Sequence, residues 1–144
     1  KGNVRARRNP YMLTCLALVA FNVASLGDIP KMATDLEAEA RTLAAVSTFS
    51  PDFVSRIEAF SGDAQRLSTS LQNAGVGQDM PCIFQGIAND AQERAAEFTD
   101  ADTQTEQDAA FMNLRVLMED TVMLAPLAAS AAADRADERN IALR

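Results

Sequence analysis

The residue types that carry out most enzyme chemistry are scarce in this sequence. It contains two cysteines, Cys15 and Cys82, and neither histidine nor tryptophan. Histidine is the commonest general base near neutral pH and the commonest metal and haem ligand. Helical di-metal sites also depend on Glu-x-x-His pairs, which cannot form without it. We therefore expect a protein that is not an enzyme, and we predict no catalytic, cofactor-binding or metal-ligating residue.

Cys82 is the one candidate nucleophile that has a favourable position. It follows Met80 and Pro81 at a predicted helix start, where the positive end of the helix dipole favours a thiolate. A thiol nucleophile also needs a neighbouring base, and histidine is missing. We interpret Cys82 as a small packing residue, with a reactive or modified thiol as the alternative. Cys15 lies in an apolar run and is expected to pack or to face lipid. The spacing of the two matches no metal motif.

An acidic run at residues 100–111, DADTQTEQDAAF, begins like a calcium-binding loop. It departs from that loop at two essential positions, because Thr105 replaces the turn glycine and Phe111 replaces the bidentate glutamate. Thr103 and Glu106 instead have the Thr-x-x-Glu spacing of a helix capping box. The sequence also has no Gly-rich phosphate loop, nucleophile elbow or CxxCH haem motif. We expect this run to be a linker that leads into a helix.

The composition predicts one helical domain. The 144 residues are 48% apolar and 23% charged, with 6 glycines and 5 prolines. Few chain-breaking residues and abundant alanine favour long helices over many short strands. The length allows one ordinary hydrophobic core. We therefore predict an all-α protein.

The net charge of −7 is unevenly distributed. The first eight residues carry four positive charges and no acid, which leaves nine basic and 20 acidic residues in the remainder. An acidic body argues against nucleic-acid binding, which needs a basic surface to neutralise phosphates. A short basic lead beside an apolar run instead fits membrane topology.

Apolar periodicity predicts an acidic helical bundle over residues 28–144, an antiparallel arrangement of four helices near 29–48, 51–74, 79–98 and 104–136. The second has the clearest seam, which consists of Phe53, Ile57, Phe60, Ala64, Leu67 and Leu71. The last has two apolar stripes, and Pro126 is expected to kink or divide it. One stripe contains Leu114, Leu117, Thr121, Leu124 and Ala128, and the other contains Met112, Val116, Met123 and Leu127. We interpret the methionines Met32, Met80, Met112, Met118 and Met123 as core residues rather than as a pliable binding groove.

Residues 1–27 are predicted to be a basic lead and an apolar anchor helix. Asn9 can cap this helix, Pro10 suits its first turn and Gly27 its end. Its apolar core, residues 11–26, would span about 24 Å, near the lower limit for crossing a bilayer. A cleaved signal peptide and a buried helix of a soluble five-helix fold are the alternatives. We favour the retained anchor, with lipid around residues 11–26.

Together these features predict a non-catalytic, single-pass accessory or structural subunit. Its helical bundle would dock on other subunits of a larger membrane protein complex, in a respiratory, photosynthetic or envelope assembly. The positive-inside rule places the N-terminus on the cytoplasmic or stromal side, and the bundle on the periplasmic or lumenal side. The alternative is a soluble or membrane-anchored four-helix domain that binds a ligand or acts as a sensor.

Overall fold

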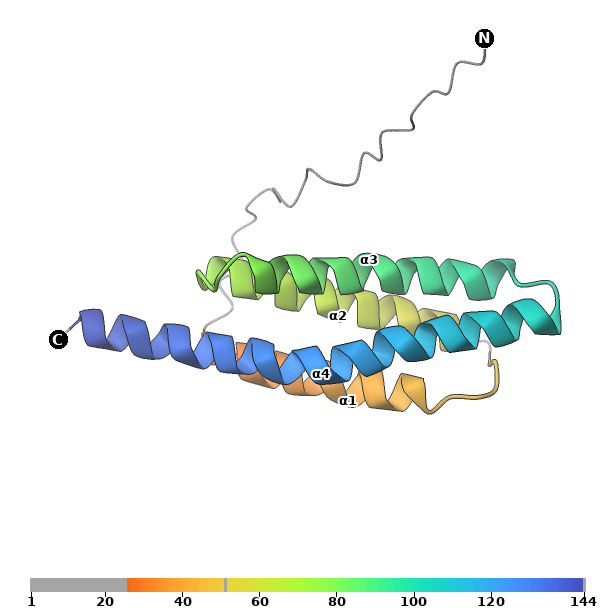
Figure 1. Cartoon of the computed structure of the whole chain (residues 1–144), viewed down its shortest axis with the longest axis horizontal. Coiled ribbons are helices and arrows are strands. Elements are labelled where there is room, and N and C mark those ends of the chain that lie inside the picture. Colours follow the sequence, from red (N-terminus) through yellow and green to blue (C-terminus); the bar gives the residue numbers. More distant parts are fainter. Residues whose placement is uncertain (1–25, 51, 144) are drawn as a thin grey trace, which may run out of the picture.

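The computed structural model describes residues 26–50 and 52–143, and in these residues it contains four α-helices and no strand. Helix α1 spans Ile29–Ala44, α2 Phe53–Asn73, α3 Asp79–Asp100 and α4 Gln104–Ala142. Consecutive helices run in opposite directions, and α4 returns to pack along α1, which closes the bundle (Figure 1). The predicted helical bundle is confirmed. The predicted apolar N-terminal helix lies outside the described residues, apart from a turn at Leu26 and Gly27.

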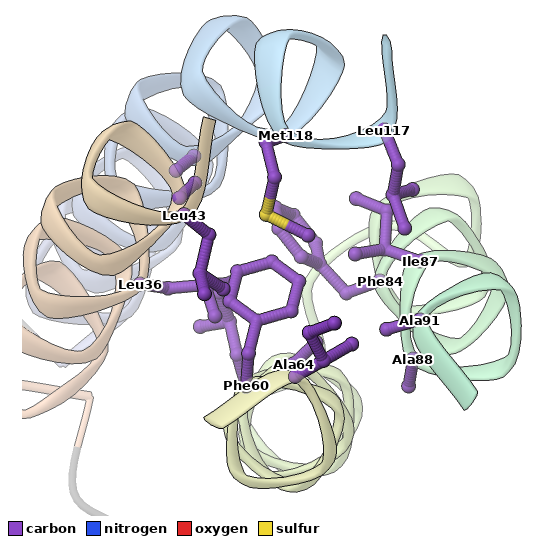
Figure 2. Close-up of a cluster of buried hydrophobic side chains, with 14 of the residues drawn as sticks. Leu36, Leu43, Phe60, Ala64, Phe84, Ile87, Ala88, Ala91, Leu117 and Met118 are labelled. Atoms are coloured by element: carbon purple, nitrogen blue, oxygen red, sulfur yellow. The ribbon is translucent and has the colours of Figure 1, made fainter. Parts of the chain in front are cut away.

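The core forms where the apolar stripes of the four helices meet. All six residues of the predicted α2 seam are buried, and the buried residues of α1 include Ile29, Leu36, Ala40 and Leu43. Figure 2 shows side chains from all four helices converging, with the sulfur of Met118 near the centre. Phe60, Phe84 and Met118 are fully enclosed. Large side chains therefore fill the space between the helices.

Small residues bring α2 and α3 close together. Ser61 and Ser68 are buried on α2, and each donates a hydrogen bond to a backbone carbonyl oxygen of α3. The Oγ of Ser61 lies 2.7 Å from the oxygen of Ala88, and the Oγ of Ser68 lies 2.6 Å from that of Pro81. These bonds satisfy two hydroxyl groups that would otherwise be costly to bury.

An aromatic cluster closes the end of the bundle where α3 turns into α4. The ring of Phe98 makes edge contacts with Phe111, at 4.8 Å between centroids, and with Phe53, at 5.1 Å. Phe49, from the α1–α2 linker, stacks on Phe98 from outside at 6.2 Å. This linker begins earlier than predicted, since α1 ends at Ala44 rather than near residue 48.

The turn after α2 has a typical helix C-terminal pattern. Gly75 has a φ angle of 71°, a left-handed conformation that glycine adopts without penalty. The N–H of Val76 donates to the carbonyl oxygen of Leu71 and that of Gly75 to Gln72, which together form a Schellman motif. The chain can therefore reverse directly into α3.

Helix α4 is much longer than its neighbours. It has 39 residues against 16 to 22 in the others, and its C-terminal part extends past the end of the bundle (Figure 1). The sequence predicts that Pro126 kinks or divides this helix, and division is wrong, because the helix continues through this residue. Pro126 is exposed, so water can solvate the backbone carbonyl that proline leaves without an N–H partner.

Candidate functional site

The outer face of α4 carries a line of apolar side chains that no part of the described chain covers. Met112 is 68% exposed, Val116 60%, Met123 66% and Leu127 51%. With 3.6 residues per turn, the four project within a sector of about 60° along roughly 22 Å of helix. We call these four residues the α4 stripe. They are the second stripe predicted from the sequence.

The opposite face of α4 is buried in the core through Leu114, Met118, Thr121 and Ala125. The helix is therefore apolar on two faces. It is the one described helix that is long and apolar enough to cross a membrane by length and composition alone, and 33% of its most apolar 18-residue window is buried in the bundle. Helices that pack in soluble proteins can meet the same criterion, so this is weak evidence for a membrane span.

A groove of about 700 Å³ runs beside the α4 stripe, between α4 and the end of α1. Ala44 and Ala45 line it from α1, and Val116, Val122 and Met123 line it from α4. The wall on the α1 side is low, because Ala44 and Ala45 have short side chains and α1 ends there. An elongated apolar ligand or side chains of a docked helix could enter this groove.

Charged residues surround the α4 stripe. Glu119 lies between Val116 and Met123 along the helix, Asp120 follows it, and Arg115 lies on the side towards α1. Within the described residues, none of these three forms an ion pair. Acids elsewhere on the bundle often do, as Glu37 with Arg41 at 2.7 Å and Glu39 with Arg56 at 2.8 Å. The stripe therefore has acidic groups available for a partner.

Cys82 does not provide an available thiol. It lies half-buried in the first turn of α3 and is disulfide-bonded. The chain's other cysteine, Cys15, lies outside the described residues. A sulfur held in a disulfide is not a thiolate nucleophile, so the structure gives no support to the alternative of a reactive thiol at this position.

The acidic run at residues 100–111 forms the predicted capping box. The N–H of Glu106 donates to the Thr103 hydroxyl at 3.3 Å, and Glu106 Oε2 accepts from the N–H groups of Thr103 and Asp102 at 2.9 and 3.0 Å. The Thr103 hydroxyl, followed by the two N–H groups, holds the pKa of Glu106 below its usual value. The Glu106 carboxylate is therefore engaged in hydrogen bonds at the N-terminus of α4. No group of three or more acidic or thiol side chains that could hold a metal ion is found in the described ranges.

The methionines are divided between the core and the surface. Met118 is fully buried, and Met32 and Met80 are half-buried against the core. Met112 and Met123 are exposed, so the interpretation of all five as core residues is wrong for these two. Periodicity placed them on the second stripe of α4, but it could not decide which of two stripes faces the bundle.

No family model matches the chain, and no curated protein or solved structure is significantly similar to it.

Proposed function

We propose that the protein is a non-catalytic accessory subunit whose helical bundle docks on a larger membrane protein complex through the outer face of α4. The observation that carries this proposal is the α4 stripe, in which four large apolar side chains are each more than half exposed. Single exposed apolar residues are normal on soluble proteins, whereas a contiguous line of them is typical of interaction sites.

The size of the stripe limits what it can do alone. Covering four half-exposed side chains stabilises a complex by about 4 to 6 kcal/mol. Association of two free proteins costs about as much or more in lost translational and rotational freedom. The stripe therefore needs additional polar contacts, or attachment of both partners to one membrane, which raises their effective concentration. A membrane-bound subunit of a stable assembly meets this requirement.

The disulfide of Cys82 supports a location outside the cytoplasm. Disulfides persist in oxidising compartments such as the periplasm and are rare in the cytosol. This agrees with a bundle on the periplasmic or lumenal side and a basic N-terminus on the cytoplasmic or stromal side.

The proposed anchor is the apolar segment at residues 9–27. Leu26, the last residue of the stretch expected to contact lipid, is half-buried against the bundle core. The bundle thus begins where the proposed span ends. Release of the full chain from membranes by an alkaline carbonate wash would argue against a spanning segment. The chain has two cysteines, so a disulfide within one chain would join Cys82 to Cys15 in the middle of the proposed span, which cannot reach the bundle. The anchor therefore requires that Cys82 pairs with a cysteine of another chain, and a disulfide-linked peptide that joins Cys15 to Cys82 would rule the anchor out.

The docking function can be tested by native electrophoresis of the full chain, extracted in mild detergent from cells of its own source. We expect the wild-type chain to migrate with a larger complex, and the double variant Val116→Asp, Met123→Asp to migrate alone. Ala59→Asp provides the matched control, since Ala59 is an exposed apolar residue on α2. Circular dichroism should show the same helix content in all three proteins. Migration of the wild-type chain alone would contradict the proposal.

The groove between α1 and α4 favours a second candidate function, the binding of a small apolar ligand. Its apolar wall is formed by Val116, Val122 and Met123, and Arg115, Glu119 and Asp120 provide polar groups at its edges. Native mass spectrometry of the isolated chain tests this possibility. A small molecule that is retained by the wild type and lost in Met123→Asp would favour it over docking.

A further inference from the structure

We infer that the α4 stripe binds an amphipathic helix from a partner subunit, with lysine or arginine on its polar flanks and one of these cations opposite Glu119. This inference rests on the proposed docking function and names the chemistry of the partner. It follows from the shape of the stripe, from the charges at its edges and from the failure of other occupants to match them.

The shape of the stripe fits a helix. Its four side chains lie in a nearly straight line of about four helical turns. Because the backbone of α4 is hydrogen-bonded within the helix, α4 has no free edge to which an extended strand could be added. A second helix laid along the stripe can insert side chains on one flank into the groove beside Ala44 and Ala45. Helices pack most closely where such small residues line the contact.

The charges require a basic partner. Glu119 lies at one edge of the stripe, between Val116 and Met123 along the helix, so a docked helix would remove water from its carboxylate. Without a compensating cation this desolvation would cost more than the covered apolar area contributes on that turn. Asp120 adds a second negative charge at the other edge, and Asp108 a third beyond Met112, whereas Arg115 is the only base between residues 108 and 127. Arg41 also lines the groove from α1, but it is paired with Glu37 at 2.7 Å. A partner with lysine or arginine on its flanks complements this surface.

A second copy of the chain does not complement this surface. Antiparallel pairing that superimposes the two stripes places Glu119 of one copy opposite Asp120 of the other, and parallel pairing in register places Glu119 opposite Glu119. Both arrangements bring like charges together at the centre of the contact, which is destabilising. An anionic lipid surface is disfavoured for the same reason.

The test uses the full chain in non-ionic detergent and two synthetic helical peptides of 20 residues. Both carry leucine along one face, and the flanking positions are lysine in one and glutamate in the other. Fluorescence anisotropy should show that the chain binds the lysine peptide at least about ten-fold more tightly than the glutamate peptide. Binding should weaken as salt concentration rises, because salt screens the flanking charges.

Two variants of the α4 stripe and two matched controls locate the binding. We expect Glu119→Lys and Met123→Asp each to weaken binding of the lysine peptide by about ten-fold or more. Glu58→Lys and Ala59→Asp make equivalent changes on α2, diagonally across the bundle, and should leave the affinity unchanged. If all four variants bind the peptide as the wild type does, the inference is wrong.

The outcomes also separate this inference from the docking function. If both peptides bind equally, and Met123→Asp weakens both, then α4 docks a helix but the partner is not basic. If ultracentrifugation shows self-association that Met123→Asp abolishes, the occupant is a second copy. If binding to phosphatidylcholine vesicles falls in Met123→Asp, the occupant is lipid. If the wild-type chain migrates alone in native electrophoresis, the docking function itself fails, whatever the peptides show.

Discussion

The Nη2 atom of Arg139 donates a hydrogen bond of 2.8 Å to the backbone carbonyl oxygen of Ala74, 65 residues earlier in the chain. Ala74 is the C-cap of α2, where carbonyl oxygens lack partners within the helix and carry partial negative charge. Arg135, one turn earlier in α4, lies beside Gly75 in the same turn. The extended end of α4 is thus joined to the α2–α3 connection.

Replacing Arg139 by alanine should lower the free energy of unfolding by about 1 kcal/mol, because a cationic hydrogen bond to a helix C-terminus is lost. Urea denaturation followed by circular dichroism measures this change. Asn140→Ala alters the adjacent exposed residue and should have no effect. Equal urea midpoints for the two variants would mean that the contact contributes nothing in solution.

Ser61 should tolerate alanine far better than leucine. Ser61→Ala removes one hydrogen bond but leaves the Ala88 carbonyl oxygen in the α3 helix, so we expect a loss of about 1 kcal/mol. Ser61→Leu inserts a large side chain where α2 and α3 are close together, and should cost about 3 kcal/mol or more. Thermal unfolding compares the two. A leucine variant as stable as the alanine variant would show that the two helices are not tightly packed.

Phe98 should be the most important member of the aromatic cluster. Phe98→Ala leaves a cavity between Phe53 and Phe111 and should lower the free energy of unfolding by about 3 to 5 kcal/mol. Phe49→Ala removes a ring that is 41% exposed, and its cost should be below about 1.5 kcal/mol. Guanidinium denaturation of both variants checks this difference. Similar losses of stability in the two variants would contradict this prediction, because they would mean that Phe49 contributes as much to the cluster as Phe98 does.

Stability should depend on pH through Glu106. Its pKa is lowered in the folded protein, chiefly by the Thr103 hydroxyl, so folding favours the carboxylate. Its contribution is therefore complete above the usual pKa of glutamate, and is lost as the pH falls through the lowered value. Glu106→Gln should be less stable than the wild type at pH 7, and the difference should disappear towards pH 3. Asp108→Asn changes another carboxylate in the first turns of α4 and serves as the control. A difference that does not depend on pH would contradict this assignment.

Much of the fold could be predicted because the helix signals are local. The α2 seam repeats every three or four residues, and Gly75 and the Thr103–Glu106 pair mark helix ends through contacts within one turn. The end of α1 could not be predicted as well, because residues 45–48 have no comparable stop signal. The contact between Arg139 and Ala74 joins distant parts of the chain, and no local pattern indicates it.

The candidate site could be predicted only in part. The sequence shows two apolar stripes on α4. The buried face contains Leu114, Leu117, Thr121 and Ala128 of the first stripe, together with Met118 and Ala125, which the prediction left out, whereas Leu124 is only half-buried. Which of the two stripes is buried depends on how α1 and α3 pack against α4, since either face alone would satisfy the amphipathic pattern. The structure buries the face with Leu114 and Thr121 and leaves the face with Met112 and Met123 exposed.

The unequal exposure of three methionines on α4 has a practical consequence. Thioethers oxidise to sulfoxides according to their accessibility, so dilute peroxide should modify Met112 and Met123 and spare Met118. The helix thus contains two reporters and an internal reference within twelve residues of sequence. Mass spectrometry of peroxide-treated cells could then show whether the outer face of α4 is covered inside the cell, before any partner has been identified.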